Sequence, residues 1–151
     1  MMINELTFRP MTLDDIDAVM HLENAVYQFP WTDKIFKDCI RVGYDCWLAL
    51  LENKVVAHAV ISVAAGESHI LNLSVTGDHQ GKGIGKQFIQ FLLNIAHNKR
   101  AQIMMLEVRP SNVRAIKCYN SAGFNEIGSR KDYYPAPNGK EDALLFARQI
   151  P

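Results

Sequence analysis

The chain has 151 residues, of which 48% are hydrophobic, and its 16 basic and 16 acidic side chains give a formal net charge of zero. This length and composition suit one compact domain with a substantial core, so residues 1–151 are predicted to form a single domain. The balanced charge argues against general binding to nucleic acid, which needs an excess of Lys and Arg. No apolar run is long enough to span a bilayer, and residues 1–5 do not resemble the start of a signal peptide.

The three cysteines, Cys39, Cys46 and Cys118, are odd in number and form no CxxC pair. This pattern argues against a disulfide framework and against a zinc site. The five histidines are also scattered without the spacing of metal ligands. We therefore expect no metal and a reducing, cytoplasmic location.

Hydrophobic periodicity and turn residues predict both helices and strands. In chain order they are a strand over 6–9, helices over 12–26 and 32–42, strands over 47–51, 55–63 and 69–76, a helix over 84–95, a strand over 103–108, a helix over 112–123, and strands over 124–127 and 143–146. Thr12 and Thr32 are expected to cap the first two helices, and residues 52–54 to form a hairpin turn. A loop holding Tyr133 and Tyr134 separates the last two strands. This order is typical of a mixed α/β sheet with helices on its faces.

The segment between the strand at 69–76 and the next helix is rich in glycine and lysine. Residues 75–86 read Val-Thr-Gly-Asp-His-Gln-Gly-Lys-Gly-Ile-Gly-Lys. Glycines at 81, 83 and 85 allow the backbone to approach a ligand closely and to adopt positive φ where needed. The loop leads into a helix N-terminus, where N–H groups and the helix dipole attract phosphate, and Lys82 and Lys86 add positive charge. The pattern predicts a ligand that contains a diphosphate.

Two common diphosphate motifs do not fit this segment. A dinucleotide-binding GxGxxG motif would require glycine at position 86, which is Lys86. A P-loop would require Ser or Thr after that lysine, and the residue is Gln87. From these residues alone, a flexible loop with a glycine-rich helix entry remains an alternative.

A carboxylate and a phenol follow further along the chain. Glu107 lies near the end of a predicted strand, and Asn112 and Tyr119 lie seven residues apart in the next helix, so they project from nearly the same face. A carboxylate can accept a proton and a phenol with a pKa near ~10 can donate one. The alternatives are ordinary: Glu107 as a salt-bridge partner, Asn112 as a helix cap and Tyr119 as a packed ring.

Several motifs together resemble a known family. Gln80-x-x-Gly83-x-Gly85 after a strand resembles the Q/R-x-x-G-x-G/A motif of the Gcn5-related N-acetyltransferases. Within that superfamily, the chain is similar to the bacterial RimI-type ribosomal-protein-alanine N-acetyltransferases over almost its whole length. The stretches that carry this similarity are Leu106-Glu107-Val108-Arg109-x-Ser111-Asn112, Ala115-Ile116-x-x-Tyr119-x-x-x-Gly123-Phe124, Phe29-Pro30-Trp31-Thr32, Asn72-Leu73-Ser74-Val75, Asp132-Tyr133-Tyr134-Pro135 and Glu141-Asp142-Ala143.

The resemblance implies a fold and a co-substrate. The fold is a central mixed, mostly antiparallel sheet of about seven strands with helices on both faces, splayed between the fourth and fifth strands. The co-substrate is acetyl-CoA, with its pyrophosphate on the loop amides and its pantetheine arm along the preceding strand. The implied cofactor-binding residues are Leu73, Ser74, Val75, Gly81, Lys82, Gly83, Ile84, Gly85, Lys86 and Asn112. Gly81 departs from the pattern, because members of the family often carry a second basic residue there.

The resemblance also implies the chemistry. Glu107 would accept the proton of the amine, directly or through water, and Tyr119 would protonate the departing thiolate. Residues expected to contact the acceptor are Phe29, Trp31, Tyr133 and Tyr134, although Trp31 and Tyr134 also suit a core. A free α-amine has a pKa near ~8 and lysine one near ~10.4, so a carboxylate base favours an α-amine.

The expected acceptor is the N-terminal alanine of a small-subunit ribosomal protein. A small-molecule amine, an antibiotic or a protein lysine is the alternative acceptor, and a non-catalytic acetyl-CoA-binding domain is the alternative class of protein. The expected partner is therefore a protein or peptide N-terminus, with neither nucleic acid nor membrane bound directly. We expect a monomer, with a dimer as the alternative.

Overall fold

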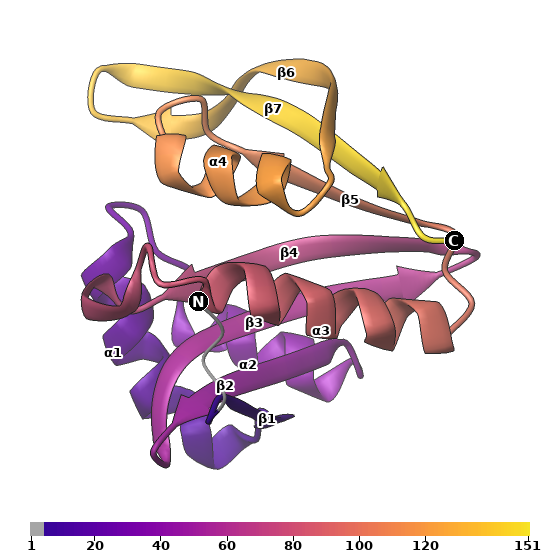
Figure 1. The fold of residues 1–151 in the computed structure, drawn as a ribbon. Coiled ribbons are helices and arrows are strands. Elements are labelled where there is room, and N and C mark those ends of the chain that lie inside the picture. The colour runs from indigo at the N-terminus through magenta and orange to yellow at the C-terminus, as the bar shows by residue number, and fades with distance from the viewer. Residues whose placement is uncertain (1–4) are drawn as a thin grey trace. The chain divides into compact units, whose positions relative to one another are not determined.

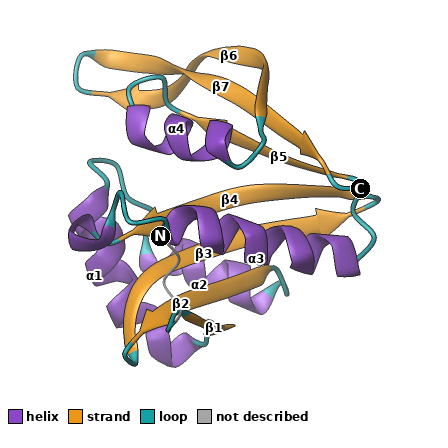
Figure 2. Ribbon diagram, in the orientation of Figure 1, coloured by secondary structure: helices purple, strands orange, loops and turns teal. Residues whose placement is uncertain are grey.

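The computed structural model describes residues 5–151 of the chain (Figure 1). Its elements are β1 (Thr7–Pro10), the 3-10 turn η1 (Leu13–Asp15), α1 (Ile16–Val26), α2 (Asp33–Arg41), β2 (Asp45–Leu51), β3 (Lys54–Ala64), β4 (Glu67–Val75), the 3-10 turn η2 (Gly77–His79), α3 (Ile84–Asn98), β5 (Ile103–Val108), α4 (Val113–Ser121), β6 (Asn125–Ala136) and β7 (Gly139–Gln149). The predicted order of helices and strands is confirmed, as the purple helices and orange strands of Figure 2 show.

The strands of the described chain form one seven-stranded sheet in the order β1-β2-β3-β4-β5-β7-β6. The ladders β1–β2, β2–β3, β5–β7 and β6–β7 are antiparallel, whereas β4 and β5 pair in parallel. That parallel ladder joins only Glu67–Ile70 to Ile103–Leu106, although β4 continues to Val75. The mixed, mostly antiparallel sheet is therefore confirmed, and the short pairing of the fourth and fifth strands accords with the predicted splay.

The described chain divides into two compact units. The first contains the described residues up to Ser62 together with Leu71–Phe88, and the second contains Val63–Ile70 and Ile89–Pro151. The strands β3 and β4 and the helix α3 each pass from one unit into the other. Each unit contains buried apolar residues.

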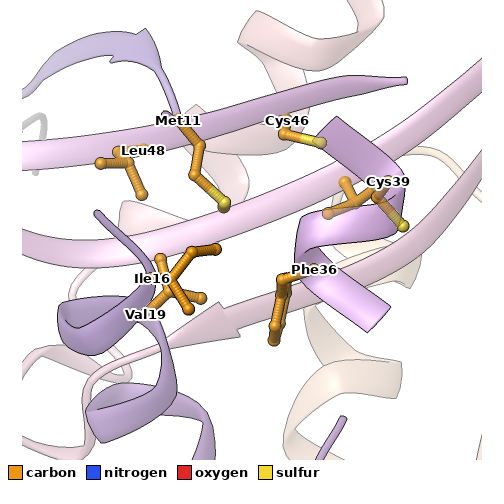
Figure 3. Packing of buried hydrophobic residues seen from close by; sticks show 8 residues of the cluster. Met11, Ile16, Val19, Phe36, Cys39, Cys46 and Leu48 are labelled. Carbon is orange, nitrogen blue, oxygen red and sulfur yellow. The ribbon is translucent and has the colours of Figure 1, made fainter. Parts of the chain in front are cut away.

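The core of the first unit lies where α1, α2 and Met11 meet the strands β2 and β3 (Figure 3). Ile16 and Val19 are buried on α1, and Phe36 and Cys39 are buried on α2, in both cases at the spacing of one helix face. Cys46 on β2 is also buried in this cluster. Burial raises the pKa of the Cys46 thiol to about 12, so this cysteine behaves as a small apolar residue.

Of the two predicted caps, Thr12 precedes the turn η1 without a side-chain cap bond, and Asp15 is the N-cap of α1, so that prediction is wrong; the Thr32 prediction is confirmed. Thr32 caps α2, with its hydroxyl oxygen accepting a hydrogen bond from Ile35 N at 3.3 Å. The hairpin between β2 and β3 turns at Glu52 and Asn53, whose φ angles are 52° and 64°. Two consecutive left-handed residues are typical of the short turn whose twist matches its two flanking strands.

The C-terminal hairpin differs from the prediction. Tyr133 and Tyr134 lie in β6 and not in a loop, and both β6 and β7 are far longer than the predicted strands. The ladder between β6 and β7 shifts register between Arg130 and Tyr134, where Asp132 has a φ of 51° and its N–H donates to Asp142 Oδ1 at 2.9 Å. This irregularity breaks the alternation of side chains that identifies a strand in sequence, which is why the sequence predicts only the first part of β6.

Asp15 gives a test of the N-terminal turn. Its carboxylate accepts hydrogen bonds from Thr12 N at 2.8 Å and from the Arg9 guanidinium at 2.8 and 2.9 Å. The bond from Arg9 is the largest cause that lowers the pKa of Asp15 to about 2, from an ordinary 3.8. Because the folded-state pKa lies below the unfolded one, the ionised group stabilises the fold above pH 3.8, and this contribution is lost as the pH falls toward 2.

We expect Asp15→Asn to lower the free energy of unfolding by about 1 kcal/mol near neutral pH, allowing for the solvent exposure of Arg9. The difference in the free energy of unfolding between the variant and the unsubstituted protein should shrink to nearly zero as the pH falls to about 2. Urea unfolding over a series of pH values measures both. A loss that stays constant with pH would contradict this account of the turn.

Candidate functional site

The glycine-rich loop lies in the first unit, between β4 and α3. Gly81 and Gly83 have φ angles of 78° and 85°, in the left-handed region that favours glycine, whereas Gly85 lies inside the first turn of α3. A Cβ atom added to Gly81 would meet no atom within 4 Å, so the loop is open at this position. The backbone conformation therefore explains two of the three glycines in the predicted phosphate loop.

Side-chain and backbone hydrogen bonds hold this loop at the end of β4. The Gln80 side-chain amide donates to Val75 O at 2.9 Å, and Thr76 N donates to Val56 O at 2.9 Å. The Thr76 hydroxyl lies 2.8 Å from His79 Nδ1. The glutamine of the Q-x-x-G-x-G motif thus has a structural task, which is to close the loop onto the last residue of its strand.

The entry into α3 offers donors suited to phosphate. Gln87 N donates to Gly83 O at 3.0 Å, so the N–H groups of residues 84–86 come before the first donor that bonds back into the helix. Lys82 and Lys86 are exposed beside them. The side chain of Ile84 is only 1% exposed and belongs to the core, so this residue offers a ligand its N–H alone. Backbone N–H groups and ammonium groups at the start of a 15-residue helix fit a diphosphate.

The strand β4, which precedes the loop, is hydrogen-bonded to α1 and to the residue that follows α1. Leu73 O accepts a hydrogen bond of 2.6 Å from the Tyr27 hydroxyl, and Ser74 Oγ donates to Glu23 Oε1 at 2.9 Å. Ser74 is only 2% exposed. Any contact of Ser74 with a ligand must therefore come from its backbone, because its side chain faces the interior of the first unit.

A buried polar cluster lies beneath this strand. Glu23 is 1% exposed and accepts hydrogen bonds from Trp31 N at 3.0 Å and Asn72 Nδ2 at 3.2 Å in addition to Ser74. His58 Nε2 lies 3.4 Å from Glu23 Oε1, and burial lowers the pKa of this histidine to about 4. Burial raises the pKa of Glu23. The sequence signal for this cluster is a glutamate on the same helix face as Ile16 and Val19.

The two aromatic residues predicted to contact the acceptor in this unit differ in exposure. Phe29 is 40% exposed. Trp31 is half-buried and packs against the core, with its ring 5.2 Å from that of Phe36 at an interplanar angle of 54°. Phe29 is thus available to a partner, whereas Trp31 supports the segment that carries it.

The proposed acid–base residues lie in the second unit. Glu107 is the second-last residue of β5, and its side chain is 26% exposed. Arg130 Nε lies 3.6 Å from Glu107 Oε2, an oxygen that is buried and has no hydrogen-bond partner among the described residues. Burial, followed by the negative charge of Glu107, raises the pKa of the nearby Tyr133. Glu107 is therefore an ion-pair partner, as its ordinary interpretation suggests, and it also carries one oxygen with unused acceptor capacity.

Asn112 and Tyr119 lie at the start and in the later part of α4. Asn112 Oδ1 accepts a hydrogen bond of 3.2 Å from Ala115 N and so caps the helix. Tyr119 is 7% exposed, and its ring packs 5.9 Å from that of Phe124. Asn112 thus caps its helix and Tyr119 packs as a buried ring, which were the alternative interpretations of these two residues. The cap fixes the position of the Asn112 side-chain nitrogen, and the ring packing fixes that of the Tyr119 hydroxyl.

The turn between Glu107 and Asn112 is clamped by residues that sequence reasoning missed or assigned differently. Arg109 Nη1 donates to Glu141 Oε1 at 3.2 Å, and Ser111 N donates to Glu141 Oε2 at 2.9 Å. The bonds from Ser111 are the largest cause that lowers the pKa of Glu141, followed by Arg109. The Arg109 guanidinium also lies 4.4 Å above the Tyr134 ring. Glu141 and Tyr134 are thus engaged in holding this turn.

Tyr133 is the exposed member of the tyrosine pair. Its side chain is 50% exposed, and its ring meets that of Tyr134 edge-on at a centroid distance of 4.9 Å. Of the four residues predicted to contact an acceptor, the exposed ones are therefore Phe29 in the first unit and Tyr133 in the second.

Residues 5–151 contain neither a cluster of metal ligands nor a membrane-spanning helix. In this range no three His, Cys, Asp or Glu side chains gather as a metal ion would require. No helix in the same range combines the length and apolar character needed to cross a membrane. All three cysteines lie within it, and none of them forms a disulfide.

Comparison with known proteins identifies the family. A family model for the acetyltransferase (GNAT) family matches residues 16–124. The chain is 33% identical over 144 residues to the [ribosomal protein bS18]-alanine N-acetyltransferase of Escherichia coli K12, covering 95% of this chain and 97% of that protein. The crystal structure of the ribosomal-protein-S18-alanine N-acetyltransferase from Escherichia coli is similar with a TM-score of 0.88 and 32% identity, covering 96% of this chain and 94% of that one.

Ard1 from Thermoplasma volcanium is similar in fold, with a TM-score of 0.87 at 22% identity, over 97% of this chain and 99% of that one. The family model alone spans well over half of the chain, and it includes the glycine-rich loop, β5 and α4. The chain therefore belongs to the GNAT family of acetyltransferases, and it is an N-acetyltransferase by its family and its named relatives.

Proposed function

We propose that this enzyme transfers the acetyl group of acetyl-CoA to the N-terminal alanine α-amine of a small-subunit ribosomal protein. The observation that carries the proposal is the 33% identity, over 95% of the chain, to a relative named as a [ribosomal protein bS18]-alanine N-acetyltransferase. We further propose that residues 1–151 work as one domain, as a monomer and in the cytoplasm. The family match supports the first of these, because it extends over parts of both compact units.

The residues that would hold acetyl-CoA fit its chemistry. Its diphosphate suits the N–H groups at the start of α3 and the exposed Lys82 and Lys86. Its pantetheine arm would bond to backbone groups of residues 73–75, and Asn112 is a further proposed contact. When bound, acetyl-CoA supplies an acetyl group activated as a thioester.

The chain's own groups would move the protons. Glu107 would take one proton from the substrate ammonium group, directly or through a water molecule, on its partly exposed carboxylate. The amine nitrogen then forms its bond to the acetyl carbon as the carbon–sulfur bond breaks. The Tyr119 hydroxyl would give its proton to the leaving sulfur, and the second proton that the nitrogen loses on becoming an amide would restore the Tyr119 hydroxyl. Glu107 is then left with the one proton that the overall reaction releases.

Acceptor choice follows from basicity and from exposed aromatic surface. At neutral pH an α-amine holds about a hundredfold more of its neutral form than lysine does, so it demands less of a carboxylate base. Phe29 and Tyr133 have the exposed surface for contact with a peptide. The carboxylates of Glu141 and Asp142 accept hydrogen bonds from backbone N–H groups of their own unit, so they are poorly suited to contact the acceptor peptide.

A pair of peptides tests the acceptor. One begins with a free alanine α-amine and contains no lysine, and the other has the same sequence with a blocked α-amine and one added lysine. We expect the first to be acetylated at least about tenfold faster, because of the difference in amine basicity. Mass spectrometry measures the product. Acetylation of the lysine peptide, or of a small amine in preference to both peptides, would instead support the alternative acceptors.

Glu107→Gln tests the base. The substitution keeps the shape of the side chain but removes the proton acceptor, so kcat should fall by about a hundredfold or more while binding of acetyl-CoA stays nearly unchanged. Glu126→Gln, at an exposed glutamate of the same unit, is the matched control and should retain full activity. If Glu107→Gln turns over as fast as the unsubstituted enzyme, Glu107 is not the base.

Tyr119→Phe tests the acid. The ring and its packing on Phe124 are retained, so the fold should be as stable as before within about 1 kcal/mol. Turnover should fall by about a hundredfold, with little change in the dissociation constant of acetyl-CoA. Tyr44→Phe, at an exposed tyrosine, serves as control. Normal turnover in Tyr119→Phe would exclude the role in thiolate protonation.

A further inference from the structure

The proposed chemistry does not use the most deeply buried carboxylate of the first unit. Glu23 lies in the later part of α1, is 1% exposed, and accepts hydrogen bonds from three groups. Trp31 N and Asn72 Nδ2 donate to Oε2 at 3.0 and 3.2 Å, and Ser74 Oγ donates to Oε1 at 2.9 Å. A carboxylate removed from water in this way is costly unless such donors replace the water.

These donors come from two segments with different proposed tasks. Trp31 ends the short segment after α1 that carries the exposed Phe29, whereas Asn72 and Ser74 belong to the strand proposed to hold the pantetheine arm. A second tie runs between the same two segments, because the Tyr27 hydroxyl donates to Leu73 O at 2.6 Å. The two oxygens of Glu23 therefore join the proposed acceptor segment, residues 27–31, to the proposed cofactor strand β4.

Glu23 is not placed to act as an acid or base itself. Its side chain is almost fully enclosed, and both oxygens already accept hydrogen bonds from the protein. The titratable groups that face it are His58 on β3, with Nε2 at 3.4 Å, and Tyr27, whose pKa is raised by burial and, to a smaller degree, by the charge of Glu23. A buried apolar group would often stabilise a core as well or better, so the fixed direction of these hydrogen bonds is what a carboxylate adds.

We propose that Glu23 is a positioning residue that locks the segment 27–31 onto β4 and so preforms the surface against which the acceptor peptide is held. This inference rests on the proposed function, because it takes Phe29 and its neighbours as acceptor contacts. It assigns to Glu23 an effect on the binding of the peptide and not on the transfer step.

Glu23→Gln tests the proposal. The amide has one acceptor oxygen in place of two and no negative charge, so the charge-assisted bonds from Trp31 N and Asn72 Nδ2 are weakened and that with Ser74 Oγ is weakened or reversed in direction. We expect the backbone N–H of Trp31 to exchange with solvent about tenfold faster or more, as measured by NMR. KM for the alanine peptide should rise by about tenfold, while kcat at saturation and the dissociation constant of acetyl-CoA change by less than about threefold.

Leu22→Ala is the matched control for general destabilisation. Leu22 is 4% exposed and precedes Glu23 on the same helix, from which it projects about 100° away. Its substitution should lower the melting temperature but leave the exchange of Trp31 and the KM for peptide unchanged. An equal rise in KM in Leu22→Ala, or an unchanged KM and Trp31 exchange in Glu23→Gln, would overturn the proposal.

Ser74→Ala provides a second, milder variant in case Glu23→Gln does not fold. It removes one donor on β4 and leaves the bond between Trp31 N and Glu23 intact, so KM for the peptide should rise by about threefold. A KM equal to that of the unsubstituted enzyme would contradict the proposal. The double variant Glu23→Gln/Ser74→Ala should show less than the product of the two single effects, because both act on one network.

The readouts separate this inference from the proposed function. If the unsubstituted enzyme acetylates no peptide α-amine, the proposed function fails, and the Trp31 exchange still reports whether Glu23 holds its segment. If the enzyme is active on the peptide and Glu23→Gln has normal KM and normal exchange, the inference alone fails.

Discussion

A carboxylate that is shut away from water must find donors in the protein, and in the first unit this requirement organises several elements at once. Glu23 draws a backbone N–H from the segment after α1 and two side chains from β4, and His58 on β3 lies beside it. Each donor fixes the position of its own element relative to α1. The aromatic segment at 27–31 and the strand before the glycine-rich loop are thereby parts of one arrangement within this unit.

In the second unit, two carboxylates differ in how fully their oxygens are hydrogen-bonded. Glu141 is satisfied by Arg109 and the backbone N–H of Ser111, and it serves to hold the turn that follows β5. Glu107, on the strand just before that turn, interacts with Tyr133, but its Oε2 atom has only the longer approach of Arg130 at 3.6 Å and no hydrogen-bond partner among the described residues. A satisfied carboxylate is suited to structure, whereas one with remaining acceptor capacity is suited to receive a proton. The proposed base, Glu107, therefore differs from Glu141 in having one oxygen without a hydrogen-bond donor among the described residues.

The sequence predicted the features that depend on local chemistry. Thr32 as a cap, the left-handed turn at Glu52 and Asn53, and the glycine-rich entry to α3 each depend on residues close together in the chain, and these predictions are confirmed. The fold class and the family followed from motifs whose spacing is short. The assigned roles of Glu107, Tyr119 and Asn112 stay predictions.

What the sequence could not supply depends on contacts between distant residues. Nothing near Glu23 in the chain indicates that Asn72 and Ser74, about fifty residues later, are its donors. The extent of β6 was missed because a local irregularity at Asp132 disrupts its alternating pattern. Ser74 was expected to face a ligand on the strength of its motif, and only the fold reveals that its hydroxyl is directed to Glu23.

The irregularity in β6 has a further consequence for the behaviour of the enzyme at high concentration. Among the described strands, β1 and β6 stand at the two ends of the sheet order, where unpaired backbone groups invite another chain to add a strand. The strand β1 has only four residues and includes Pro10, and β6 is interrupted by a left-handed residue and carries Arg130 and Lys131 next to it. Neither edge strand offers a long, regular row of unpaired backbone groups to another chain. The edge strands therefore disfavour aggregation by strand addition.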